Sequence, residues 1–137
     1  KNICDTNVTN IKNIDYAFFL KQAAKWIKYN GCLPHDAFKV DHRAIGRGQY
    51  EGGIHIGYVE PNQHKLIIGW GWNQHELHDF EVLCGDYSQF KWHHSEGACR
   101  PQFFIPLKAG HESDGKELYI AKAHYNNEWR IGKAGQC

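Results

Sequence analysis

The sequence has no excess of charge of either sign, no long apolar run and no strongly basic segment. Sixteen basic residues face fifteen acidic ones, which gives a net charge of +1. Because nucleic-acid binding relies on clustered lysine and arginine, no nucleic-acid partner is expected. No apolar stretch approaches the roughly 20 residues that a membrane-spanning helix needs, so no membrane span is expected either.

The short motifs of common enzymes and metal sites are also missing. The chain contains no Gly-x-Ser-x-Gly, no phosphate-binding loop and no Rossmann glycine pattern, so neither an enzyme nor a bound cofactor is expected. It has no Cys-x-x-Cys pair, and His75-Glu-Leu-His78 lacks the spacing of a zinc-binding helix, so no metal site is predicted. A nucleophilic cysteine beside His93 and His94 stays open, although disulfide or structural positions suit Cys84 and Cys99 better.

Five cysteines in 137 residues favour an oxidising compartment, and the odd number leaves one for a free thiol or a second chain. They are Cys4, Cys32, Cys84, Cys99 and Cys137. Asn7-Val-Thr9 is a glycosylation sequon if the chain is secreted. The chain begins with Lys and has no signal-like segment, as a mature product would after removal of its leader. These features together predict a secreted glycoprotein, and a disulfide-linked homodimer stays open.

One stretch of the sequence occurs twice. Without a gap, Ile45, Tyr50, Ile56 and Gly57 align with Ile120, Tyr125, Ile131 and Gly132. Upstream, Lys25-Trp26, Gly31-Cys32 and Pro34 are followed in the same order by Lys91-Trp92, Gly97, Cys99 and Pro106. Two landmarks in one order predict a tandem duplication. We therefore expect a single domain over 1–137, with an N-terminal arm and helix over 1–24, a first repeat over 25–91 and a partial second repeat over 92–137.

The fold class is predicted to be mainly β, with antiparallel strands in a pseudo-twofold arrangement. Apolar and β-branched runs at 65–72, 78–84, 102–105 and 117–121 are separated by turn residues, and Asp114-Gly115 is typical of a hairpin. Residues 1–14 are expected to form an irregular arm. Apolar residues between Tyr16 and Ile27 recur at helical spacing and predict one short helix over 15–25. Alternatively, residues 15–20 resemble 79–83 and supply a strand that the truncated second repeat lacks.

Four tryptophans, Trp26, Trp70, Trp72 and Trp92, are expected in the core, because large aromatic residues in repeated positions usually pack there.

The sequence resembles the DM-nine repeat, a family that includes invertebrate mannose-binding lectins and natterin-like toxins. The first repeat carries Trp26, Gly31, Pro34-His-Asp-Ala37, Ile45-Gly-Arg47, Gly69 to Gly71 and Phe80-Glu-Val-Leu83. The second carries Trp92, Ile105-Pro106, Ala109-Gly110, Leu118-Tyr-Ile-Ala-Lys-Ala123 and Gly132-Lys133. The resemblance covers residues 25–137 and implies a metal-free mannose site.

In the second repeat, the resemblance assigns that site to Glu112, where the family usually has Asp, to Glu128 and to Lys133. Tyr125 or Trp129 could cover the apolar face of the sugar ring. The corresponding first-repeat positions are Asp41, Gly53 and Tyr58, which describe a degenerate second site.

Two functions follow from these observations. The first is a secreted, metal-independent, mannose-type carbohydrate-binding protein whose partners are glycans or glycoproteins. The alternative is a secreted protein-binding effector or inhibitor, such as a venom, salivary or immune factor, on the same scaffold with a decayed sugar site.

Overall fold

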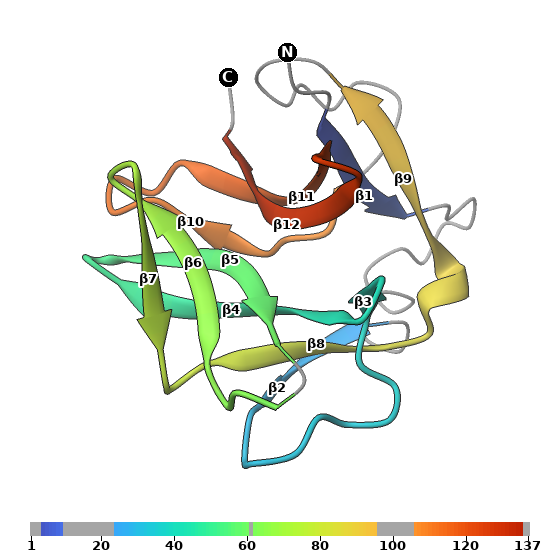
Figure 1. Cartoon of the computed structure of the whole chain (residues 1–137). Helices are drawn as coiled ribbons and strands as arrows, with labels where there is room; N and C mark the ends of the chain where they lie inside the picture. The colour runs from blue at the N-terminus through green and yellow to red at the C-terminus, as the bar shows by residue number, and fades with distance from the viewer. Residues whose placement is uncertain (1–3, 10–23, 61, 96–105, 136–137) are drawn as a thin grey trace.

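The protein is built mainly from short antiparallel strands, which confirms the predicted fold class (Figure 1). This computed structural model describes residues 4–9, 24–60, 62–95 and 106–135. The strands are β1 (Cys4–Thr9), β2 (Ala24–Lys28), β3 (Lys39–Val40), β4 (Arg43–Tyr50), β5 (Gly53–Val59), β6 (Leu66–Trp70), β7 (Asn73–Leu77), β8 (Glu81–Gly85), β9 (Phe90–Ser95), β10 (Gly110–His111), β11 (Glu117–Tyr125) and β12 (Glu128–Gly135). A 3-10 turn, η1 (Tyr87–Gln89), precedes β9. No helix in these ranges is long and apolar enough to cross a membrane.

The duplicated stretch forms two equivalent hairpins, β4–β5 and β11–β12. Tyr50 pairs with Gly53 and Tyr125 pairs with Glu128, so each hairpin closes with a two-residue turn. Both turn residues have positive φ in each case: 48° and 82° at residues 51 and 52, and 51° and 63° at residues 126 and 127. This conformation matches the right-handed twist of paired strands, and glycine and asparagine adopt it most easily.

The strand order confirms the pseudo-twofold arrangement. It runs β2-β8-β4-β5-β10-β11-β1-β9, so β2-β8-β4 at one end corresponds to β9-β1-β11 at the other. The registers also correspond: Trp26 lies opposite Leu83 and Arg47 opposite Glu81, while Trp92 lies opposite Asn7 and Lys122 opposite Asp5. Strand β1 therefore takes, in the second repeat, the place that β8 takes in the first.

The N-terminal region differs from the sequence-based expectation. Residues 4–9 form a paired strand, so the prediction of an irregular arm is wrong there. Ala24 and Lys25, the expected end of the helix, belong to β2. The remainder of the proposed helix, with the alternative strand at 15–20, lies outside the described residues. A closing strand does exist, but 4–9 supply it. The predicted strand at 102–105 also lies outside the described residues.

The repeated isoleucines meet in one core between the two hairpins. Ile45, Ile56, Ile120 and Ile131 are all at most 6% exposed and belong to the same apolar cluster. Full burial of each such side chain contributes about 1.5–3 kcal/mol. Trp26 and Trp92 pack against this cluster. The two tryptophans therefore fit the expectation that they contribute to the core.

Equivalent cations cover those two tryptophan rings. The Arg47 guanidinium lies 4.3 Å from the Trp26 ring centre, and Lys122 Nζ lies 4.7 Å from that of Trp92. The duplication thus preserves side-chain contacts as well as strand positions.

The β6–β7 hairpin covers the first repeat and has no counterpart after β12 in the described part of the chain (Figure 1). Leu66 and Ile68 of β6 pack on Val59, Phe80 and Val82 in a second core cluster. Strand β6 comes so close to β5 that a Cβ added to Gly57 would lie 1.9 Å from the Ile67 carbonyl oxygen. At the equivalent Gly132, an added Cβ would have nothing within 4 Å. The first glycine is therefore required by packing, whereas the second is not.

Candidate functional site

Lys133 of β12 reaches across the boundary between the repeats to His55 of β5. Lys133 Nζ lies 2.6 Å from His55 Nδ1, and His55 Nε2 lies 3.1 Å from the Tyr50 carbonyl oxygen. Because a carbonyl only accepts, we assign the imidazole proton to Nε2, and Nδ1 then accepts a hydrogen bond from the Lys133 ammonium. Among the described residues that ammonium has no other hydrogen-bond partner, so two of its three N–H donors stay open there.

Burial shapes the charge of this pair. His55 is 1% exposed, and burial lowers its pKa, with a further lowering from the Lys133 charge. Burial likewise lowers the pKa of Lys133, and the negative charge of Glu112 acts in the opposite direction. The site therefore holds a neutral imidazole beneath a partly desolvated ammonium. Hydrogen bonds from such a cation are stronger than those from a fully hydrated one.

Glu112 follows β10 at the same place. Its backbone N–H donates to the Lys116 carbonyl at 2.9 Å, and its carbonyl accepts from Gly115 N–H at 3.0 Å. This turn contains Asp114-Gly115, as the hairpin prediction required. Within the described ranges the Glu112 carboxylate forms no ion pair within 4.0 Å, so it keeps its acceptor capacity for a ligand. Its charge nevertheless acts on both Lys133 and His55.

The end of the β6–β7 hairpin forms the other wall of a groove above these two residues. Figure 1 shows the β6–β7 turn beside the β10–β11 connection. The groove has a volume of about 510 Å³ and is lined by residues 69–74 of the hairpin together with Glu112 and Lys133. This size is in the range of small-molecule sites.

The two tryptophans of this wall differ in their environment. Trp70 is 39% exposed and is fixed by edge contacts with Tyr50, at a centroid distance of 5.5 Å, and with His75, at 6.2 Å. Trp72 is 105% exposed and has a φ of 68°. The expectation that the tryptophans lie in the core is therefore wrong for Trp72, and Trp70 is only partly covered. Both residues lie at the turn end of the β6–β7 hairpin, whereas the buried residues of that hairpin lie further from the turn.

Glu128 lies outside this groove. It belongs to the second repeat but contacts residues of the first repeat, at the site that is related to the groove by the pseudo-twofold. It accepts a hydrogen bond from Arg43 Nη1 at 3.2 Å, and Arg130 Nη2 lies 3.7 Å away. Arg43 also donates from Nε to Glu60 at 2.7 Å. Burial of Arg43 acts to lower its guanidinium pKa, but the hydrogen bonds with Glu60 and Glu128 outweigh it, so the pKa is raised. The Glu128 carboxylate is thus engaged by the protein's own cations.

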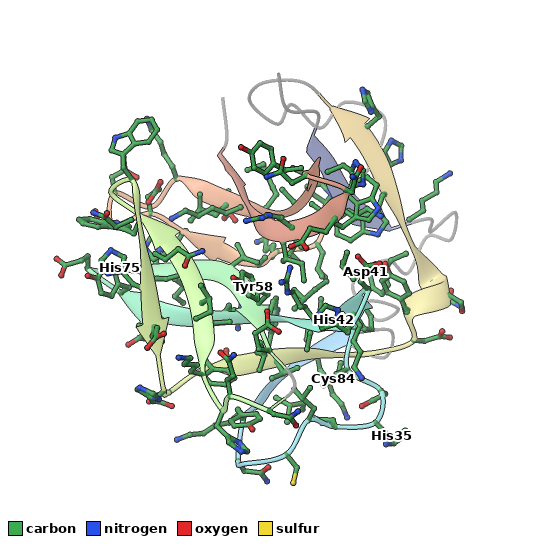
Figure 2. The ribbon with its side chains drawn as sticks, in the orientation of Figure 1. His35, Asp41, His42, Tyr58, His75 and Cys84 are labelled. Atoms are coloured by element: carbon green, nitrogen blue, oxygen red, sulfur yellow. The ribbon has the colours of Figure 1, made fainter. Side chains whose placement is uncertain are left out.

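Of the first-repeat positions, Tyr58 and the turn that contains Asp41 lie beside this ion-pair network. The Arg43 guanidinium lies over the Tyr58 ring at 4.9 Å, and His42 Nε2 lies 3.7 Å from Glu60. Asp41 occupies the β3–β4 turn with a φ of 56°. Figure 2 shows Asp41 and His42 on the side of the molecule away from His75, whose ring contacts Trp70. The structure therefore brings Glu128 toward Tyr58, not toward Lys133.

Tyr125 is also separate from the groove. It is 53% exposed at the end of β11, and its ring faces Arg130 at 5.5 Å. Tyr125 lies opposite Glu128 in the hairpin register, while Lys133 lies opposite Ile120, further along the strands. Of the four residues predicted to bind sugar, Glu112 and Lys133 share a groove, and Glu128 and Tyr125 do not belong to it.

The pseudo-twofold explains this division. Each of the two equivalent sites draws on both repeats. The acidic residue and the residue at the lysine position come from one repeat, and the residue at the glutamate position comes from the other. The residue that would complete the Lys133 site is Gly53, the equivalent of Glu128. A Cβ there would lie 2.6 Å from the His111 carbonyl oxygen, so this backbone leaves no room for a glutamate.

Sequence reasoning missed His55 and the position of Trp70 and Trp72 at the groove. A signal for Trp72 was present: the dipeptide Gly71-Trp72 links two strands of opposite direction, with Trp70 paired to Asn73. Such a two-residue turn places both central residues in the left-handed region and leaves their side chains exposed. No signal in the sequence identifies His55, because its contact with Lys133 depends on packing between the repeats.

In the described residues, the cysteines and the possible metal ligands do not come together in a reactive or metal-binding site. Cys32 is an exposed free thiol and Cys84 a buried one. Burial, with the nearby Asp36 charge, raises the pKa of Cys84 to about 11, so this thiol is a poor nucleophile. Asn7, the predicted glycosylation site, lies in β1 opposite Trp92. No group of three or more candidate metal ligands comes together in the part of the chain that the structure describes.

The fold and the site define a β protein of two repeats with a groove between them. The DM9 repeat family matches residues 36–136, and the chain belongs to this family. It is 24% identical over 126 residues to Natterin-4 of Thalassophryne nattereri, a match that covers 88% of this chain and 30% of Natterin-4. No solved structure gives a significant match.

Proposed function

We propose that this protein recognises carbohydrate, of mannose type and without a metal ion, through the groove between Glu112, Lys133 and the end of the β6–β7 hairpin. Membership of the DM9 family supports a carbohydrate-binding or related function. The observation that carries the proposal is the convergence, in one groove of about 510 Å³, of a carboxylate, a partly desolvated ammonium and an aromatic wall.

Each of these groups suits one part of a sugar. A carboxylate accepts hydrogen bonds from two neighbouring hydroxyls, and an ammonium donates to a hydroxyl or ring oxygen. Hydrogen bonds to charged groups contribute about 1.5–3 kcal/mol each, but lost hydration and lost freedom of the sugar offset much of this. One site lacking the third residue of the family pattern is expected to bind with millimolar affinity, about 4 kcal/mol. Useful binding then requires a multivalent glycan or an oligomer of the protein.

We further propose that the protein acts outside the cell and has no catalytic activity. The five cysteines and the Asn7 sequon support the first point. A recognition function is supported by the site itself, where the imidazole of His55 is buried beneath Lys133 and points its acceptor at that cation.

The test compares two glutamates. Glu112→Gln should weaken binding of mannose or mannan at least tenfold, because it removes a charge-assisted acceptor from the groove. Glu128→Gln is the matched control, because its carboxylate is engaged by Arg43 outside the groove, and sugar binding should stay within twofold of the wild type. Lys133→Ala should reduce binding at least tenfold while the fold survives. Equal losses in the two glutamate variants would contradict the assignment.

The protein-binding alternative rests on two observations. Gly53 stands where the family pattern has a glutamate, and at the other site Arg43 forms an ion pair with that glutamate, Glu128. A glycan array separates the two functions. Silence across the array, with folded protein, would favour the protein-directed effector.

A further inference from the structure

The stability of the fold does not explain why residue 72 is a tryptophan. Its side chain is 105% exposed, so it buries no apolar surface within the chain. It is the second central residue of the β6–β7 turn, where Gly71 and Trp72 have φ values of 62° and 68°. Turns of this type favour asparagine, aspartate and glycine, and a bulky residue is strained there. Backbone strain combined with full exposure of a large aromatic residue is a pattern found at functional sites.

Trp72 lines the same groove as the two charged residues of the site. The groove that it lines contains Glu112 and Lys133 on the opposite wall. The neighbouring Trp70 is held by Tyr50 and His75, and the His75 ring also receives the Tyr50 hydroxyl at 3.1 Å and lies 3.0 Å from the Trp70 carbonyl oxygen. These contacts hold Trp70 in place at the end of the hairpin, while the Trp72 ring projects from its tip.

We propose that Trp72 stacks on the apolar face of a pyranose ring whose hydroxyl edge is held by Glu112 and Lys133. The inference rests on the proposed function and deepens it, because it states that the groove binds the ring form of the sugar in preference to the open chain. A pyranose has a polar edge of hydroxyls and a face of C–H groups, and an indole covers such a face with little loss of conformational freedom. An open-chain polyol offers the same hydroxyls without the face. The Trp72 contact therefore discriminates between the two, whereas the charged pair alone does not.

The experiment measures dissociation constants for methyl α-mannoside and for mannitol by NMR titration. Trp72→Asn should weaken mannoside binding about tenfold, with much less effect on mannitol. Trp72→Phe should retain most of the mannoside binding, because an aromatic face remains. Asparagine suits the left-handed turn, so Trp72→Asn is expected to stay folded. Tyr125→Ala is the matched control, since it removes an exposed aromatic from the other hairpin outside the groove, and it should bind as the wild type does.

The outcomes separate this inference from the proposed function. Wild-type mannoside affinity in Trp72→Asn, together with lost binding in Lys133→Ala, would overturn the stacking contact and leave the sugar site in place. Equal weakening of mannoside and mannitol would overturn the selection of the ring form. Absence of mannoside binding in the wild type would overturn the proposed function and the stacking contact with it.

Discussion

Substituting Gly57 by alanine tests the close packing of β6 on the duplicated hairpin. A Cβ at residue 57 would lie 1.9 Å from the Ile67 carbonyl oxygen and 3.0 Å from Ile68 Cγ2. Ordinary Cβ contacts are no shorter than about 3.4 Å, so β6 would have to move by more than 1 Å. Such a shift disturbs the pairing of Tyr58 with Ile67 and of Val59 with Leu66, and the packing of Leu66 and Ile68 in the second core cluster.

The expected loss in unfolding free energy is about 3 kcal/mol or more, because the clash is with backbone and cannot be relieved by a rotamer change. Gly132→Ala is the matched control at the equivalent position. It meets nothing within 4 Å and should change stability by at most about 0.5 kcal/mol. Urea denaturation, followed by tryptophan fluorescence, measures both. A difference of less than about 1 kcal/mol between the two variants would refute the claim that β6 covers only one of the two hairpins.

Four further predictions concern single residues. Trp72→Asn should raise the free energy of unfolding by about 1 kcal/mol, because it relieves a left-handed backbone strain without losing burial; an unchanged urea midpoint would contradict this. The pKa of His55 is lowered in the folded protein, so below its ordinary value of 6.5 the unfolded chain binds a proton that the folded chain does not. The free energy of unfolding should therefore fall with falling pH, by at most about 1.4 kcal/mol per pH unit, until the lowered pKa is passed. His55→Gln should remove that part of the pH dependence. Arg43→Ala should cost about 1–3 kcal/mol, because it leaves the Glu60 and Glu128 carboxylates without their shared partner, while sugar binding persists. If the exposed Cys32 thiol links two chains, Cys32→Ser should abolish a reductant-sensitive dimer on a gel; persistence of that dimer in the variant would exclude Cys32.

The duplication could be predicted from the sequence because two of its anchor pairs are core residues. Ile45 and Ile120, with Ile56 and Ile131, keep their identity since they meet in the same cluster. The sequence indicates a closing strand only as an alternative to the helix, and that alternative places it at residues 15–20, whereas residues 4–9 form it. Residues 4–9 are polar, with little of the alternation that marks a strand, and only their pairing with β9 and β11 gives them an ordered place.

The site could be predicted only in part, because sequence order does not show which repeat contributes each residue. Glu112 and Lys133 were assigned together and lie in one groove. Glu128 precedes Lys133 by five residues along one strand, and the pseudo-twofold brings it to Arg43 of the other repeat. The sequence predicts a buried Trp72 because large aromatic residues in repeated positions usually pack in the core, but its side chain is exposed. Turn geometry overrides that tendency here.

The most direct test of the proposed site is an NMR titration of the wild-type protein with mannose, with and without a chelator, followed through the backbone amides and the indole N–H groups. Sugar binding in the groove predicts saturable, chelator-insensitive shifts at Glu112, Lys133 and the Trp70 and Trp72 indoles, with none at Glu128 or Tyr125. Shifts centred on Glu128 and Tyr58, or shifts that vanish with the chelator, would contradict it.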